Sequence, residues 1–269
     1  SGVTISAGAI NVAGPVTVNG AAVTVSSSIT TTTSGGDITI PASGIVSVTA
    51  ALSASGNVGI NGTTVTTSAN AASSGANGIA MTATAGAVTI GGTLAVTTST
   101  TGKIWLKATS NIVTGVSDTL TTNGGAVVLW ARSASTEDTS NQVGEGYIKL
   151  DNASFISTTC GAIILACSSN TNSNGYPNGH TYTNTASTYG VFMGTTTTGT
   201  AVNLTTSDGN SATTDGNIRI YAQTGTSAAH AMFIKNNATA TTWDSGSGRQ
   251  DINLLSANQV TTTGYAFEV

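Results

Sequence analysis

The sequence predicts an all-β protein that folds as a right-handed parallel β-helix, a β-solenoid in which short strands stack turn upon turn. Three observations support this fold: a recurring phrase of strand, corner and strand, a regular spacing of that phrase along the chain, and a composition that disfavours helix. Thr, Ser, Asn, Val and Gly recur throughout the chain, and all of them are weak helix formers. We therefore expect little or no helix, and strands too short to be stable without neighbours.

The recurring phrase is clearest at Leu120–Trp130, which reads LTTNGGAVVLW. A threonine-bearing run leads into an Asn-Gly-Gly corner, and an apolar run with side chains on alternate faces follows it. The same phrase returns, in places more loosely, at Ser28–Ile40, Phe155–Leu165 and Leu94–Leu106. Repetition of one such unit indicates the successive turns of a solenoid.

Two regions differ in charge but not in pattern. Residues 1–100 form nearly uncharged, regular rungs, and Asp37 is the sole acidic or basic side chain among them. Residues 101–269 continue the same strand runs but carry longer polar insertions. These insertions are Ser133–Glu145, Ser168–Tyr189 and Asn236–Arg249. Because the strand runs resume after each insertion, we interpret residues 1–269 as one solenoid domain with loops.

The spacing of the strands separates two β architectures. A period of about 20 residues with two or three short strands favours a parallel β-helix over a sandwich, whose strands recur roughly every 8–12 residues. Right-handed winding is the expected hand of parallel crossovers. The irregular length of the later periods leaves a tandem β-sandwich or jelly roll as the alternative fold.

The sequence also allows predictions about membrane insertion, processing and disulfide bonding. No apolar run reaches the roughly 18 residues of a membrane-spanning helix, so no transmembrane segment is expected. The chain begins at Ser1 inside a predicted strand, which suggests a processed product or a piece of a longer repetitive protein. Cys160 and Cys167 flank an extended apolar run that would hold them too far apart for a disulfide to each other.

Three phrases carry a resemblance to a known kind of protein: SGGDITI at Ser34–Ile40, TTNGGAVVL at Thr121–Leu129 and STTCGAIIL at Ser157–Leu165. They resemble the repeats of very large bacterial surface proteins of the filamentous-haemagglutinin and β-strand-repeat adhesin type. In those families a right-handed β-helix forms an exported fibre, so the resemblance implies an extracellular or cell-surface location. It implies no site residue, because the repeat encodes scaffold.

Large side chains are expected on the outer surface of the later strands. The middle residue of each strand run faces outward, and it changes from Thr in the first hundred residues to larger residues afterwards. Stacked in register, these residues and their neighbours would form an exposed apolar stripe, which is our candidate contact surface. Its members are Trp105, Val128, Trp130, Tyr147 and Ile164. The alternative is that an insertion folds back over the stripe.

The outward threonines of the first hundred residues suggest a second possible surface. A flat ladder of hydroxyl and methyl groups can order water, so these residues form a candidate ice-binding face. They are Thr4, Thr17, Thr24, Thr39 and Thr89. A strict Thr-x-Thr repeat is missing, and this disfavours the ice-binding function.

Enzyme activity is not expected. A glycoside hydrolase or lyase needs paired carboxylates, or Lys and Arg beside an acidic sugar. The densest group of such residues is Glu137, Asp138, Glu145 and Asp151 near Lys149 and Arg132. Most of them lie in or beside a Ser/Asn-rich insertion, which favours a solvated loop over a catalytic site.

No cofactor, metal or nucleic acid is expected either. His180 and His230 are isolated in the sequence, and the Asp-Gly-Asn motifs at 208–210 and 215–217 lack the glutamate of a calcium loop. The 7 Lys and Arg residues are scattered, so they cannot neutralise a run of phosphates.

The sequence therefore predicts a structural protein, a building block of an extracellular fibre, filament or sheath. A solenoid ends in strands whose unpaired backbone groups invite another chain unless a polar cap covers them. Neither end of the sequence reads as a cap, so we expect identical subunits to associate head to tail. The candidate end-to-end interface consists of Val3, Ile5, Tyr265, Phe267 and Val269. The alternatives are a glycan-binding adhesin module that uses exposed Trp and Tyr and, less favoured, a carbohydrate-active enzyme or an ice-binding protein.

Overall fold

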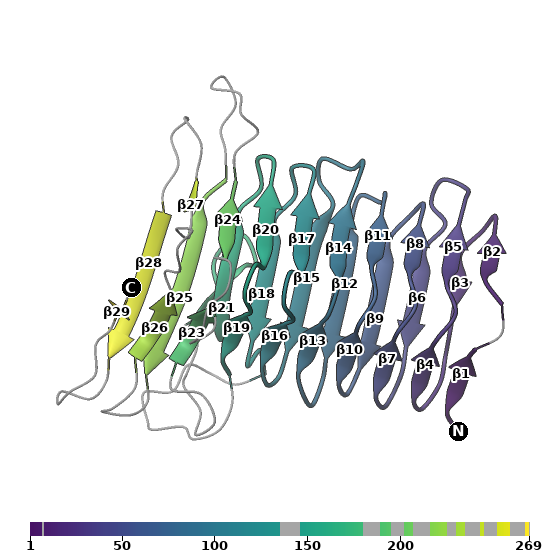
Figure 1. Cartoon of the computed structure of the whole chain (residues 1–269), viewed down its shortest axis with the longest axis horizontal. Coiled ribbons are helices and arrows are strands. Elements are labelled where there is room, and N and C mark those ends of the chain that lie inside the picture. The colour runs from purple at the N-terminus through teal and green to yellow at the C-terminus, as the bar shows by residue number, and fades with distance from the viewer. Residues whose placement is uncertain are drawn as a thin grey trace.

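The computed structural model is a β-solenoid in which three sheets run side by side along one long axis (Figure 1). It describes residues 1–6, 8–134, 146–179, 189–194, 202–206, 216–224, 230–234, 243–244, 252–258 and 267–268. These residues contain strands, turns and bends but no helix, as the composition predicts. The fold class predicted from the sequence, an all-β solenoid, is confirmed.

Apart from one short strand that pairs back onto its predecessor, the chain visits the three sheets in rotation, and we name them sheets A, B and C. Sheet A contains β1 (Val3–Ile5), β4 (Val23–Val25), β7 (Val46–Val48), β10 (Val65–Thr67), β13 (Val88–Ile90), β16 (Ile112–Thr114), β19 (Ile148–Leu150), β23 (Tyr189–Met193), β26 (His230–Ile234) and β29 (Phe267–Glu268). Sheet B contains β2 (Ile10–Val12), β5 (Ile29–Thr31), β8 (Leu52–Ala54), β11 (Ala71–Ser73), β14 (Thr93–Val96), β17 (Thr119–Thr122), β20 (Phe155–Thr158), β24 (Asn203–Thr205) and β27 (Trp243–Asp244). Sheet C contains β3 (Val16–Thr17), β6 (Ile38–Pro41), β9 (Val58–Gly62), β12 (Gly78–Ala83), β15 (Lys103–Ala108), β18 (Val127–Ala131), β21 (Ile163–Thr171), β25 (Ile218–Thr224) and β28 (Ile252–Asn258), and β22 (Pro177–Gly179) pairs with β21.

Strand register sets the length of each turn. Val3 pairs with Val23, Val23 with Val46, Val46 with Val65 and Val65 with Val88, so the early turns are all of similar length. Each of these pairs is parallel, as are all the pairings between successive turns, whereas β22 runs antiparallel to β21. Parallel pairing between successive turns excludes the sandwich and jelly-roll alternative, which is built from antiparallel sheets.

Later turns are longer because insertions lie between the strands. Ile112 of β16 pairs with Ile148 of β19, and the insertion at residues 133–145 lies between them in the sequence. Register is kept across this gap, since Ile112 and Ile148 are both fully buried core residues. The backbone ladder and the apolar core therefore resume in phase after the insertion.

The core is a stack of aliphatic side chains enclosed by the three sheets. In a three-residue strand such as β4, Val23 and Val25 are buried while Thr24 between them is half-buried on the outside. This alternation follows from the two-residue period of a strand. The ladders of Val, Ile and Leu that line the core continue from turn to turn, and they form one connected cluster.

Several corners between sheets B and C are fastened by a hydroxyl group. The side chain of Thr122, the last residue of β17, donates a hydrogen bond to the carbonyl of Gly125, and Thr158 does the same to Gly161. Thr206 and Gly216 repeat the arrangement at 2.8 Å. The recurring phrase of the sequence is thus this corner, in which a buried threonine satisfies the carbonyl of a glycine.

The two cysteines flank the start of strand β21 without forming a disulfide. Cys160 lies half-buried in the corner before the strand, and Cys167 is buried within it. This agrees with the extended run predicted between them.

Candidate functional site

An aromatic and cationic cluster lies on the outer face of sheet C. The ring centres of Trp105 in β15 and Trp130 in β18 are 5.8 Å apart in an edge-to-face arrangement, and Tyr176 stacks on Trp105 at 5.9 Å. The Nζ atom of Lys107 lies 4.3 Å from the centre of the Trp130 ring, and that of Lys103 lies 5.1 Å from the Tyr176 ring. We call these five residues the aromatic cluster.

Register brings the predicted stripe together. Trp105 pairs with Val128 and Val128 pairs with Ile164, so these outward positions lie on three adjacent strands. Trp130 follows two positions after Val128 and therefore shares its face. The side chains pack with Tyr176 and Tyr221 into a second apolar cluster outside the main core.

The exposure predicted for the stripe is wrong for its central members. Val128, Ile164 and Trp130 are 0%, 2% and 7% exposed, and Trp105 is half-buried. The segment between β21 and β22 supplies the cover, since Tyr176 stacks on Trp105 and packs against this second cluster. The alternative stated above, an insertion folded over the stripe, is therefore the observed one.

A hydrogen bond anchors the cover. The indole N–H of Trp130 donates to the backbone carbonyl of Ser168 at 2.6 Å. Ser168 has a positive φ of 68°, and β22 pairs antiparallel with β21 beyond it. The Trp130 ring and the start of the insertion are thereby held together, so the indole N–H has a partner although the ring is buried.

Tyr147 does not belong to this surface. It lies before β19, in the corner that leads into sheet A, and its backbone N–H is bound by the side chain of Asn111 at 3.1 Å. In the sequence, the insertion at residues 133–145 separates it from Trp130 of β18. Conversely, sequence reasoning missed Lys103, Lys107 and Tyr176 in the cluster. Alternation along β15 could have identified the two lysines as neighbours of Trp105, whereas the position of Tyr176 depends on how the insertion folds.

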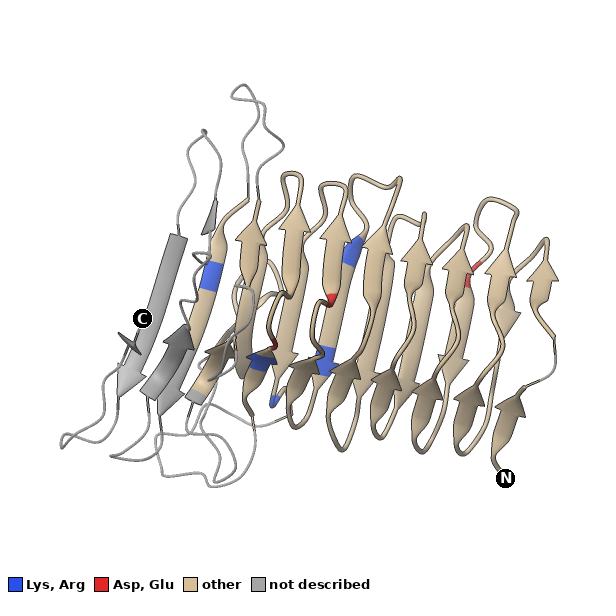
Figure 2. Ribbon diagram, viewed as in Figure 1, with Lys and Arg blue, Asp and Glu red and all other residues tan. Residues whose placement is uncertain are grey.

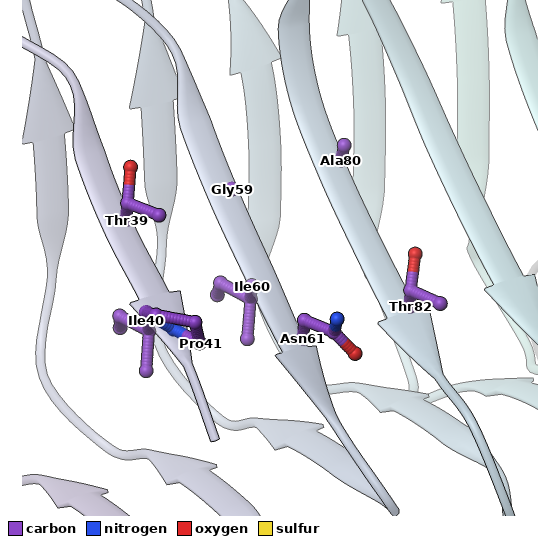
Figure 3. A pocket seen from close by; sticks show the side chains of 8 residues that line it. All are labelled: Thr39, Ile40, Pro41, Gly59, Ile60, Asn61, Ala80 and Thr82. Carbon is purple, nitrogen blue, oxygen red and sulfur yellow. The ribbon is translucent and has the colours of Figure 1, made fainter. Parts of the chain in front are cut away.

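An open groove of about 280 Å³ lies beside the aromatic cluster on the same sheet (Figure 3). Figure 3 shows Thr39, Asn61 and Thr82 on three adjacent strands, with Gly59 providing no side chain between its neighbours. The complete lining is Thr39, Ile40, Pro41, Gly59, Ile60, Asn61, Ala80 and Thr82. Hydroxyl and amide groups surround a floor of small residues, so the groove offers hydrogen bonds without charge.

The threonines of the candidate ice-binding face lie on two different sheets. Thr4 and Thr24 pair in sheet A, whereas Thr39 lies in sheet C. Ser47 and Thr66, which the sequence pattern omitted, complete the file in sheet A between Thr24 and Thr89. The hydroxyl ladder is therefore one residue wide in sheet A, and the ice-binding function stays a prediction.

Three of the candidate end-to-end residues, Val3, Ile5 and Phe267, belong to the edge strands of sheet A. Val3 and Ile5 are partly exposed in β1, which begins the order of strands in that sheet. Phe267 lies in β29, which ends the same order. Tyr265 and Val269 lie outside the described residues.

The candidate carboxylates are only partly described. Glu137, Asp138 and Glu145 lie outside the described residues, as does His180. Asp151 forms an ion pair at 3.1 Å with Lys149 of sheet A, away from the groove of sheet C. Within the part of the chain that the structure describes, no three His, Cys, Asp or Glu side chains group as metal ligands would.

Asp118 is a buried carboxyl group that the sequence did not single out. The residue is 3% exposed, and its side chain accepts a hydrogen bond of 2.6 Å from the N–H of Gly115. Burial raises the pKa of Asp118 and the charge of Asp151 adds to this, while hydrogen bonds from Gly115 and Gly92 act in the opposite direction. The carboxyl group closes the turn between β16 and β17, and this contact is structural.

Comparison with protein-family models, with curated proteins and with solved structures finds no match to this chain. The described residues contain no helix of the length and apolarity needed to cross a membrane. The function is therefore inferred from the solenoid and from the surfaces described above.

Proposed function

We propose that this protein is a structural rod of an extracellular fibre, filament or sheath, in which identical subunits join head to tail. The observation that carries the proposal is the position of β1 and β29 at opposite edges of one parallel sheet. The edge strands of the other two sheets are arranged alike, with β2 opposite β27 and β3 opposite β28. A second copy placed with β1 beside β29 would continue sheet A in the same direction.

The backbone of β1, at one edge, supports this contact. Val3 donates its N–H to Ala22, and Ile5 accepts from Ser26, so both residues are bonded toward β4. Successive residues of a strand direct their backbone groups to opposite sides, and Thr4 therefore presents its N–H and C=O at the outer edge. Such unpaired groups are a template for another strand. A contact between unlike edges need not close, and so it propagates into a filament.

The surface is consistent with a fibre outside the cell. Charged side chains are sparse on the described strands (Figure 2). Thr, Ser and Asn occupy many of the outward strand positions instead. The location is inferred from the resemblance of the repeats to exported surface fibres.

Electron microscopy of the purified chain tests the proposal. We expect fibres whose axial repeat equals one subunit length. The variant Thr4→Pro removes the outer N–H of β1 and retains the bonds of Val3 and Ile5 to β4, so it should shorten or abolish fibres. Thr4→Val keeps the N–H and is the matched control. Dispersed single-subunit particles of the wild type at high concentration would rule out the polymer.

A further inference from the structure

Strand β15 presents two cations and an aromatic ring on one face. Its exposure pattern alternates, so Lys103, Trp105 and Lys107 point outward while Ile104 and Leu106 are buried. The ammonium groups stand over the rings of Tyr176 and Trp130. Trp105 between them remains half-buried, with part of its surface open to solvent.

This strand borders the open groove. Ala80 of β12 pairs with Trp105, and Thr82 pairs with Lys107, so the last strand of the groove is the immediate neighbour of β15. The groove continues across β9 and β6, at right angles to the strands. A ligand in it would run along the axis of the rod and reach Trp105 and Lys107 at one end.

The charge of this face is opposite to that of the chain. The chain carries a net charge of −4. Among the described strands of sheet C, however, the charged residues are Lys103, Lys107 and Arg219, with no carboxylate. Asp37 lies in the corner before β6. Its carboxylate accepts hydrogen bonds from the backbone and side-chain amides of Asn57 at 2.7 and 3.0 Å. The face is therefore complementary to an anion.

We propose that the outer face of sheet C from β6 to β15 binds one acidic glycan chain, a polysaccharide that carries uronic acid carboxylates. A sugar ring stacks on the exposed part of Trp105, as apolar ring faces do on aromatic side chains at interfaces. Its carboxylate pairs with Lys107 or Lys103. Further sugar units lie over Gly59 and Ala80, and their hydroxyl groups bond to Thr39, Asn61 and Thr82.

The spacing of the rungs supports a chain-like ligand. Adjacent strands of a sheet lie about 4.8 Å apart. This distance is close to the length of one pyranose unit, so consecutive sugars meet consecutive strands. Open space above Gly59, where a Cβ would have no neighbour within 4 Å, leaves room for such a ring.

Calorimetric titration of the whole chain with a galacturonic acid oligomer tests the proposal. The uncharged galactose oligomer of equal length and polyglutamate serve as comparison ligands. We expect the acidic oligomer to bind, with weaker binding at high salt, and both comparison ligands to bind at least tenfold more weakly. Equal binding of the galactose oligomer would refute the acidic class, and equal binding of polyglutamate would refute a glycan. No binding of the acidic oligomer at millimolar concentration would refute the site.

Variants locate the binding face. Trp105→Ala should weaken binding by about tenfold, as expected for a central aromatic anchor, and Lys107→Gln by up to about fivefold. Lys149→Gln removes the same charge from sheet A and should leave binding unchanged. An unchanged affinity in both Trp105→Ala and Lys107→Gln would overturn the assignment.

Gly59 allows a test that leaves the aromatic cluster intact. Gly59→Glu and Gly59→Lys add long side chains of opposite charge into the groove, and the Cβ of neither meets a neighbour in the folded chain. We expect the glutamate variant to bind the acidic oligomer at least tenfold more weakly than the lysine variant. Ser53→Glu adds the same negative charge to sheet B and should have no such effect. Equal binding by the two Gly59 variants would contradict the proposed position of the ligand.

Discussion

The carbonyl oxygen of Gly125 occupies the position that a Cβ of Gly161 would need, on the next turn of the same corner. Gly216 is stacked on Gly161 in the same way, with the carbonyl of Gly161 at the position of its Cβ. In each case the distance between the added Cβ and the carbonyl oxygen would be under 3.0 Å, which is shorter than real Cβ contacts. Glycine is thus required at this corner by the close approach of successive turns.

Gly161→Ala should therefore destabilise the chain. The added methyl group meets backbone atoms, which cannot rotate away, so we expect a loss of about 1–3 kcal/mol or more in the free energy of unfolding. Gly59→Ala is the matched control, because its Cβ would have no neighbour within 4 Å. Urea unfolding followed by circular dichroism measures both. Equal stability of the two variants would contradict the stacked corner.

The threonine of the same corner makes a second prediction. Thr122 is buried and donates to the carbonyl of Gly125, so Thr122→Val should cost about 1–3 kcal/mol by leaving that carbonyl without this bond. Thr121→Val makes the same substitution on the outer face, where a change within about 0.5 kcal/mol is expected. Thermal or urea unfolding compares the pair. A loss as large for Thr121→Val as for Thr122→Val would show that the corner hydroxyl has no special role.

Asp118 should make stability depend on pH. Because its pKa is raised in the folded state, the folded chain holds this proton at a pH where the unfolded chain has released it. The contribution to stability is therefore present below the ordinary pKa of 3.8 and is lost as the pH rises through the raised pKa. Asp118→Asn should remove this decline.

The free energy of unfolding of wild type and Asp118→Asn, measured from pH 3 upward, checks this sign. The difference between the two curves should change over the interval that starts near pH 3.8. Asp37→Asn provides the comparison for the loss of one carboxylate at another corner. Parallel curves for wild type and Asp118→Asn would contradict the prediction.

Tyr176 should control whether the apolar stripe is accessible. Tyr176→Ala removes the ring that stacks on Trp105 and packs against the outer apolar cluster. We expect stronger binding of a hydrophobic dye and a tendency of the protein to associate sideways, since an uncovered apolar patch is a contact surface. Asn178→Ala alters an exposed residue of the same insertion and should leave dye binding unchanged. Unchanged dye binding in Tyr176→Ala would mean that other residues supply the cover.

Much of the fold could be predicted from the sequence because its determinants are local. Thr158 and Gly161, which fasten one corner, are close neighbours in the chain, and the alternation of Val127 to Leu129 needs no distant partner. The uncharged outer positions at the start of the chain likewise follow from local alternation and need no distant partner. Each of these patterns repeats, so one irregular turn does not obscure the period.

The candidate site could be predicted only in part. The file of Trp105, Val128 and Ile164 follows from strand register, which the repeated phrase indicates. The groove could not be predicted, because it needs three small or polar residues on strands that are each a full turn apart in the sequence, Thr39, Gly59 and Ala80. None of these residues is unusual by itself.

The sequence by itself determined the all-β solenoid, its period and its glycine-bearing corners, since these depend on strand alternation and on contacts between near neighbours in the chain. Only the tertiary structure decided that the stripe is covered, that Tyr147 lies in the corner before sheet A, and that Asp118 is buried. The physical reason is that burial depends on which distant segments meet. Tyr176 reaches Trp105 from an insertion two turns further along the chain, and no local pattern specifies that contact.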